Sequence, residues 1–185
     1  MIAHAFFFYL LAFTSCVGAG HVLWAWVLCR ISPSEYSHCR PTTTELAIIG
    51  LFVISILATF INFVAPISLG LSALFVGTFL AVGITSIIKA PFPSLLKQLV
   101  TMTVIMMFSI WGAKLVFHFD AVLYHLQAIS WMKDEPVVFG LANLHARFGF
   151  NSLILSALAI FWMPFFEVKG LLLANHLPAI LTLSL

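Results

Sequence analysis

The sequence predicts an all-α integral membrane protein, a polytopic bundle of membrane helices. Of its 185 residues, 63% are hydrophobic and only 8% are charged, whereas a soluble domain carries about 25% charged residues. A chain this apolar could not cover a globular surface with polar groups. Its apolar residues also fall into runs of about 20, the length that crosses a bilayer as a helix.

Five of these runs are long enough to cross a bilayer, and a sixth is incomplete. We expect one membrane domain, residues 1–185, with full spans at about 5–29, 46–65, 69–88, 95–117 and 150–166, a partial span at 171–185 and a polar loop at 118–149. The apolar run that follows Glu45 is too long for one crossing, so Pro66 and Ser68 are expected to divide it at a tight turn. Thr44 followed by Glu45 is typical of a helix start.

Several isolated residues have local roles in this scheme. Gly70, Gly77 and Gly83 are expected to let helices pack closely, and Asn62 to hydrogen-bond to a neighbouring helix. No Lys or Arg precedes Arg30, so the first apolar segment lacks the basic start of a secretory signal and is expected to remain as a membrane helix. The three cysteines form no C-x-x-C pair, which favours a packing role over redox or metal chemistry.

The distribution of Lys and Arg near the span ends predicts the orientation. With the N-terminus outside, the inner loops carry five basic residues and the outer ones three. The inner five are Arg30, Arg40, Lys89, Lys97 and Lys169, and the outer three are Lys114, Lys133 and Arg147. This excess places the N-terminus and the 118–149 loop on the outer side of the membrane, which in a Gram-negative cell is the periplasmic side. The scattered basic residues do not suggest nucleic-acid binding.

The 118–149 stretch is the longest segment rich in polar residues; a shorter polar loop lies at 31–45. Its first part, "FDAVLYHLQAISWM", reads as a helix on which Asp120, Tyr124, Gln127 and Trp131 share one face. Such a helix would lie along the membrane interface with its aromatic residues at the level of the headgroups. An interfacial anchor with no further role is one interpretation of the segment.

The alternative interpretation is a functional site. Asp120 directly follows an apolar span, so its carboxylate must be solvated, paired with Lys114 or Arg147, or functional. As a functional group it would be a general base or a metal ligand. His125 and His145 lack helical ligand spacing, so a divalent metal site is only weakly indicated. Arg147 would either clamp a phosphate or reach ordinary lipid headgroups.

Two segments of this stretch resemble a family of large bacterial polytopic membrane proteins. The family pattern is close to Y-D-T-G-L-Y-H-L-Q-x-x-x-W, then V-P-G-L-x-N-L-H-x-R-x-x-F-N-S. The matching residues are Asp120, Leu123, Tyr124, His125, Gln127, Trp131, Gly140, Leu141, Asn143, Leu144, His145, Arg147, Phe150, Asn151 and Ser152. The departures are Phe119 for Tyr, Ala121 and Val122 for Thr-Gly, and Phe139 for Pro.

That family is linked to envelope polysaccharide assembly and is similar to the GT-C class of lipid-dependent glycosyltransferases. The resemblance implies a polyprenyl-phosphate-linked sugar as donor and membrane lipids as surroundings. It also implies that Asp120 is the catalytic residue. The substrate-binding residues would be Tyr124, His125, Gln127, Asn143, His145 and Arg147.

Three function classes follow. The first is the N-terminal part of such a glycosyltransferase or assembly protein, because members of that family are several hundred residues long. The second is a truncated, non-catalytic or structural membrane protein. The third is transport of a lipid-linked sugar, which ranks last because charges within the spans are almost lacking.

Overall fold

The computed structural model describes residues 2–31, 41–89, 92–112, 124–140, 143, 146, 152–166 and 176–183. Within these residues the regular structure is entirely helical, which confirms the all-α class. The longer helices are α1 (Ile2–Ile31), α2 (Thr43–Asn62), α3 (Leu69–Ile88) and α4 (Phe92–Gly112). The shorter ones are α5 (Leu126–Asp134), α7 (Leu153–Phe161), the 3-10 turn η4 (Pro164–Phe166) and α9 (Leu177–Leu183).

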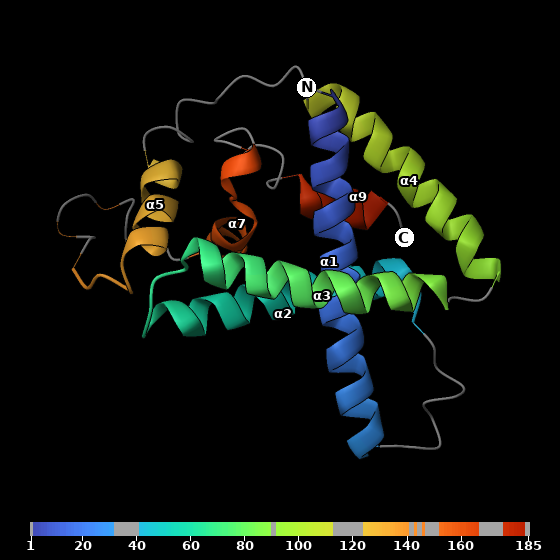
Figure 1. Cartoon of the computed structure of the whole chain (residues 1–185), viewed down its shortest axis with the longest axis horizontal. Helices are drawn as coiled ribbons and strands as arrows, with labels where there is room; N and C mark the ends of the chain where they lie inside the picture. Colours follow the sequence, from blue (N-terminus) through green and yellow to red (C-terminus); the bar gives the residue numbers. More distant parts are fainter. Residues whose placement is uncertain are drawn as a thin grey trace.

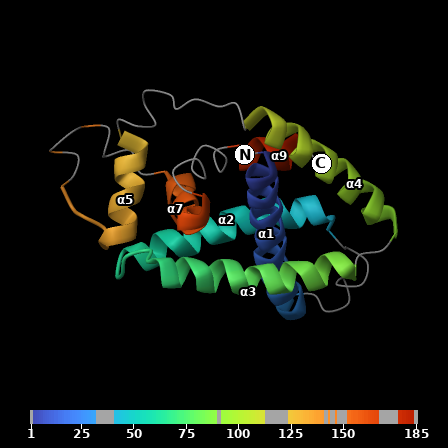
Figure 2. The same cartoon turned by 45° about the horizontal axis from the view of Figure 1, so that its top comes forward.

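Helix α1 lies between α2 and α3 and runs across both (Figure 1). The view in Figure 2 shows the same arrangement, with the α2–α3 hairpin straddling α1. Helices α2 and α3 scarcely touch each other, whereas each packs extensively on α1. Helix α1 is therefore held between the two arms of the α2–α3 hairpin, an arrangement that we call the clip. Most of the buried core residues lie along α1.

Glycines at the two crossings bring the helix backbones into direct contact. A side chain on Gly20 or Gly50 would collide with the backbone of the other helix, and the same is true of Gly18 and Gly83. Gly18 and Gly20 are separated by about 200° around α1, because each helical residue turns the chain by about 100°. One glycine therefore faces α3 and the other faces α2.

The glycine prediction is confirmed at one position and wrong at two. A Cβ atom on Gly83 would overlap the carbonyl oxygen of Thr14. In contrast, a Cβ on Gly77 would meet nothing within 4 Å, and one on Gly70 would reach only Ser68 Oγ, at 4.0 Å. These two glycines lie on the outer side of α3, away from α1.

Side-chain caps define where α2 and α3 begin. Thr42 starts α2 with a capping box, in which its hydroxyl accepts a hydrogen bond from Glu45 N (3.2 Å) and the Glu45 carboxylate accepts one from Thr42 N (2.6 Å). Ser68 caps α3 by accepting from Leu71 N at 3.3 Å. The cap of α2 lies two residues before the Thr44 that the sequence suggested, and the Pro66–Ser68 turn separates the two helices as predicted.

Three helices in the described residues are long and apolar enough to cross a membrane: Ile2–Val27, α2 and α3. The apolar part of α4, Leu99–Trp111, is shorter. Helix α7 has 9 residues, about 14 Å of helix, because Pro164 follows it and cannot continue the backbone hydrogen-bond ladder. The five-span count is not confirmed, and since α1 runs across α2 and α3, these helices do not share one direction.

The other helices lie around this clip. Helices α5 and α7 lie at the end where α2 joins α3, whereas α4 and α9 lie beside the N-terminal half of α1 (Figure 1). The C-terminal part of α1 extends beyond the hairpin, and there the Arg30 guanidinium stacks over Trp26 with 5.2 Å to the ring centroid. A Trp–Arg pair at a helix end is typical of a membrane–water interface.

Candidate functional site

Four of the seven predicted site residues lie in the described part of the chain: Tyr124, His125, Gln127 and Asn143. The other three, Asp120, His145 and Arg147, lie outside the described residues, so their predicted roles stay predictions. The structure therefore shows the frame of the polar segment rather than a complete site.

Three of these residues lie at or just before the start of α5. The rings of Tyr124 and His125 meet edge to face, with centroids 4.3 Å apart. Both side chains are half-buried, whereas Gln127 is exposed one turn further on. Trp131, predicted to share a face with Tyr124 and Gln127, is half-buried. That predicted face is thus partly packed against the protein.

Asn143 follows a turn that requires a glycine. Gly140 has a φ of 86°, a conformation that other L-residues adopt at a cost of about 1–2 kcal/mol. Its carbonyl oxygen accepts a hydrogen bond from Asn143 N at 2.9 Å. The motif on which the resemblance was based has a glycine at this position, and the left-handed φ of Gly140 gives a physical reason for it.

The strongest polar feature in the described residues is centred on Asn62, the last residue of α2. Its side-chain amide donates to the carbonyl oxygens of Met132 and Glu135, both at 3.1 Å. Its own carbonyl accepts from Val137 N at 2.7 Å, and Ile67 N donates to Met132 O at 2.7 Å. We name these bonds the Asn62 latch. It ties the α2–α3 turn to the chain that leaves α5.

Lys133 joins the same region to α3 and α7. Its ammonium donates to Ser72 Oγ (3.2 Å), Ala159 O (3.3 Å) and Trp162 O (3.2 Å). The two carbonyls belong to the C-terminal end of α7, where a cation is favoured by the helix dipole. An ammonium has three donors, and all three are used here.

Burial acts on the charge of Lys133. The side chain is half-buried, and desolvation lowers its pKa below the usual value of 10.5, an effect that the neighbouring charge of Asp134 opposes. Sequence reasoning counted Lys133 only as an outer-side charge. The signal available was its position, since Lys133 lies four residues after the buried Ile129 and therefore on the inner side of α5.

Hydroxyl groups continue the polar contacts toward α7. Thr59 Oγ1 donates to Ser55 O at 2.8 Å and lies 2.8 Å from Ser156 Oγ, whose hydroxyl donates to it because Thr59 has only one O–H group. Asn62, Lys133 and the Thr59–Ser156 pair thus join α2, α3, α5 and α7 by side-chain hydrogen bonds. Asn62 was expected to bond to a neighbouring helix, and its partner is the end of α5 and the residue that follows it.

A second polar cluster lies beside the N-terminal half of α1, away from the α2–α3 turn (Figure 1). Tyr9 Oη lies 3.3 Å from His176 Nδ1, and the His176 ring lies 5.1 Å from Trp111 and 6.1 Å from Phe108, centroid to centroid. Tyr9 is fully buried. These aromatic contacts hold α9 against α1 and α4.

Within the described residues no group of three or more His, Cys, Asp or Glu side chains is placed to hold a metal ion. The described polar groups instead hydrogen-bond mainly to one another and to helix ends. The Asn62 latch and the Lys133 hydrogen bonds together fix residues 132–137 against the α2–α3 turn. These residues connect the two halves of the polar motif.

Comparison with known proteins assigns the chain to a family. The family model described as "Domain of unknown function (DUF8201)" matches residues 1–185. No curated protein and no solved structure matches the chain. The chain belongs to the DUF8201 family.

Proposed function

We propose that this member of the DUF8201 family is a membrane-embedded helical domain that takes part in envelope polysaccharide assembly. In this proposal it acts as the N-terminal part of a GT-C-like glycosyltransferase that uses a polyprenyl-phosphate-linked sugar. The observation that carries the proposal is the Asn62 latch, since it fixes the segment between the two halves of the polar motif to the end of two membrane-length helices. In this proposal the lipid-carried donor reaches the motif at this end of the two helices.

The proposal assigns a role to each motif residue. Asp120 is the general base, or the ligand of a divalent metal, that activates the acceptor hydroxyl. Arg147 clamps the donor phosphate. The remaining polar residues bind sugar hydroxyls, namely Tyr124, His125, Gln127, Asn143 and His145. The GT-C comparison is an analogy at the level of fold.

The proposed topology has the N-terminus outside, in a bacterial inner membrane, and residues 118–149 on the periplasmic side. Two contacts support the pairing of helix ends in this topology, whereas its orientation rests on the distribution of Lys and Arg. The α2–α3 turn meets residues 132–137, all on the proposed outer side. On the proposed inner side, the start of α2 meets α4, where Thr44 Oγ1 and Thr101 Oγ1 are 3.5 Å apart.

The test measures sugar transfer by a full-length relative that carries this domain, reconstituted in lipid vesicles with a radiolabelled polyprenyl-phosphate hexose and a panel of acceptor glycans. Asp120→Asn removes the proton acceptor, so transfer falls by about two orders of magnitude or more. Asp134→Asn is the matched control, because Asp134 is a solvent-exposed acid of the same segment. Equal transfer by the wild type and Asp120→Asn would overturn the assignment of Asp120.

A second candidate function is a non-catalytic membrane scaffold. The fully occupied donors of Lys133 favour it, because this cation stabilises helix ends and has no donor left for a substrate. The same vesicles separate the two functions. A scaffold neither transfers sugar nor retains the labelled donor, whereas a glycosyltransferase part retains the donor and loses it on Arg147→Ala.

A further inference from the structure

The turn between α2 and α3, residues 63–68, is unusually apolar for a loop. No Asp, Glu, Lys, Arg or His occurs between Glu45 and Lys89. A turn that leaves the membrane for water normally carries polar or charged side chains. Here the most polar side chain near the turn is Asn62, and its amide is turned inward to the latch.

The backbone of this turn has no unpaired N–H group. The N–H groups of Phe63, Val64 and Ala65 donate to carbonyls of the last turn of α2, at 2.9–3.3 Å. Ile67 donates to Met132 O at 2.7 Å and Ser68 donates to Pro66 O at 2.9 Å, while Pro66 has no N–H. In water a turn can leave N–H groups to the solvent, whereas in lipid each unpaired group costs several kcal/mol.

Part of the loop beside the turn is hydrogen-bonded to it. Val137 N donates to Asn62 O at 2.7 Å. The carbonyl oxygen of Glu135 accepts from the Asn62 amide at 3.1 Å. The two loops are therefore one hydrogen-bonded unit, although they are about 70 residues apart in the sequence.

This unit presents large apolar side chains to its surroundings. They are Phe63, Val64, Val138 and Phe139, which we call the apolar tip. Val64 is 83% exposed and Phe139 is 84% exposed, the highest values among the large apolar side chains described. Phe60, 68% exposed on α2, continues the tip along the outer side of the hairpin.

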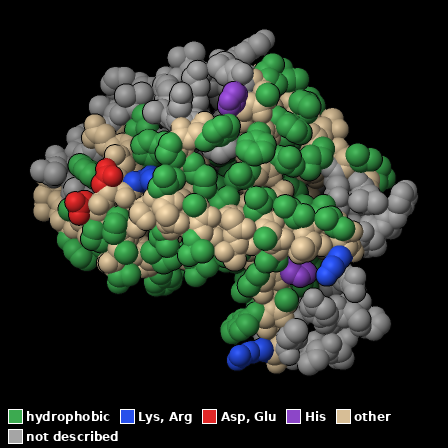
Figure 3. Space-filling model, viewed as in Figure 1, with side chains coloured by type: hydrophobic (Ala, Val, Ile, Leu, Met, Phe, Trp, Pro, Cys, Tyr) green, Lys and Arg blue, Asp and Glu red, His purple; other side chains and the backbone are tan. Residues whose placement is uncertain are grey.

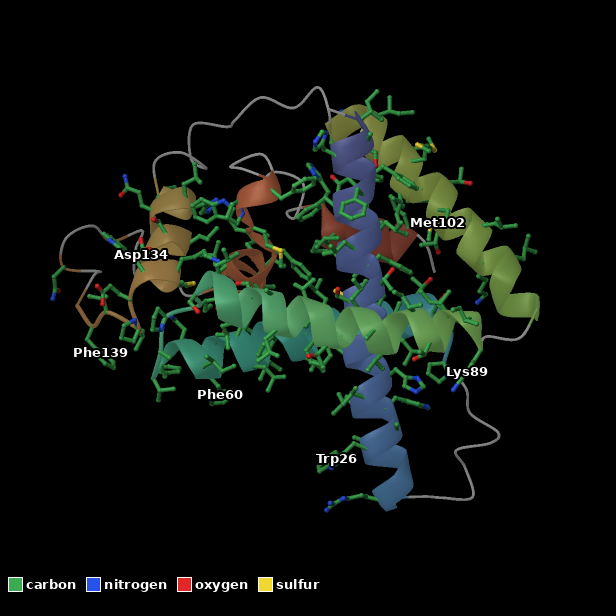
Figure 4. The ribbon with its side chains drawn as sticks, viewed as in Figure 1. Trp26, Phe60, Lys89, Met102, Asp134 and Phe139 are labelled. Carbon is green, nitrogen blue, oxygen red and sulfur yellow. The ribbon has the colours of Figure 1, made fainter. Side chains whose placement is uncertain are left out.

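Among the described residues, the charged groups next to the tip lie on its α5 side. Figure 4 shows Phe139 and Phe60 at the same end of the molecule, with Asp134 on the α5 side. In the surface view the acidic side chains gather at this α5 end, and hydrophobic side chains cover much of the hairpin (Figure 3). Asp134 and Glu135, both exposed, thus mark a boundary between a charged and an uncharged surface.

We infer that the apolar tip is immersed in the lipid bilayer, just below the headgroups, and that Asp134 and Glu135 lie at the water boundary. The bilayer is the partner that fits, because the tip continues the exposed apolar surface of two membrane-length helices and its turn has no unpaired N–H group. The inference rests on the membrane location within the proposed function. It adds that the α2–α3 turn does not emerge into water.

The test is spin-label accessibility of the full chain in phosphatidylcholine vesicles, in a background with the three cysteines replaced by alanine. Val64→Cys and Phe139→Cys report the tip, and Asp134→Cys is the matched control, since it lies in the same hydrogen-bonded region and is also exposed. Collisions with oxygen report lipid, and collisions with a water-soluble nickel chelate report water.

We expect the ratio of oxygen to nickel accessibility at positions 64 and 139 to exceed that at position 134 several-fold. High nickel accessibility at 64 and 139 would overturn the inference and place the tip in water. Low accessibility to both reagents would also overturn it, because protein, either a second copy or another chain, would then cover the tip.

A further label separates this failure from failure of the membrane location. Leu74→Cys lies on the exposed side of α3, about 9 Å along the helix from the Ser68 cap. If position 74 is also open to nickel, the hairpin itself is not in the bilayer and the membrane location fails. If position 74 reports lipid while 64 and 139 report water, only the inference about the tip fails.

Discussion

Replacing Asn62 with leucine is the sharpest test of how the polar segment is held. The substitution keeps the side-chain volume close to that of asparagine and removes both amide donors. Two hydrogen bonds of 3.1 Å are lost, to Met132 O and Glu135 O. The Met132 carbonyl keeps its hydrogen bond from Ile67 N at 2.7 Å. The main effect is therefore that the Glu135 carbonyl loses its hydrogen bond from the Asn62 amide.

The expected loss of stability follows from these two bonds. A hydrogen bond contributes about 0.5–1.5 kcal/mol net, and bonds between membrane helices average about 0.6 kcal/mol. Asn62→Leu should therefore lower the free energy of unfolding by about 1–3 kcal/mol. Asn62→Asp should lower it further, because a carboxylate has no donor and repels the two carbonyl oxygens.

The assay is unfolding of the purified chain in detergent by increasing SDS, followed by tryptophan fluorescence, together with the rate of protease cleavage within residues 134–140. Cleavage should accelerate in Asn62→Leu, since the latch no longer holds that loop. Gln127→Leu is the control for the amide-to-leucine change, because Gln127 is exposed on α5. Unchanged stability and unchanged cleavage in Asn62→Leu would refute the reasoning.

Two further predictions concern the crossing helices and Lys133. Gly50→Val should cost at least about 3 kcal/mol or prevent folding, because its side chain would collide with the Cys16 carbonyl. In Gly77→Ala the added methyl group meets open space, so this change should be neutral or stabilising by up to about 1 kcal/mol. Equal effects of Gly50→Val and Gly77→Ala on stability would contradict the close backbone contact between α1 and α2. For Lys133, the lowered pKa means that between the folded-state pKa and 10.5 the unfolded chain binds more protons, so the free energy of unfolding rises with pH there. Lys133→Met should abolish this rise, as measured by SDS unfolding across that range, and a rise that persists would show that another group causes it.

The helical class and the α2–α3 hairpin were predictable because their causes are local. Composition alone excludes a soluble domain, and Pro66 with Ser68 ends one helix and caps the next. The interruption at Pro164 has an equally local cause, yet hydropathy obscured it, since the residues on either side of the proline are as apolar as a span. A proline within a candidate span was the available signal.

The clip and the latch were not predictable in the same way, because they depend on contacts distant in sequence. In "AFTSCVGAG", small residues recur every four positions in two interleaved sets, Thr14 with Gly18 and Cys16 with Gly20. This pattern could have indicated two helix contacts on opposite faces of α1. Which helices make those contacts could not be derived from it, since many glycines in the chain are equally available.

The two features together explain why an apolar chain can position a polar segment. Backbone contact at Gly20 and Gly50 leaves no side chain to rearrange, so the crossing fixes where α2 lies on α1. The far end of α2 is then set by the rigidity of the helix, and Asn62 stands there with its amide directed at the loop after α5. The position of residues 132–137 thus depends on the Gly20–Gly50 contact and on the Asn62 amide. Gly50 and Asn62 are about three helical turns apart on α2. A change at Gly50 should therefore loosen the latch as well as the crossing, whereas a change at Asn62 should leave the crossing intact.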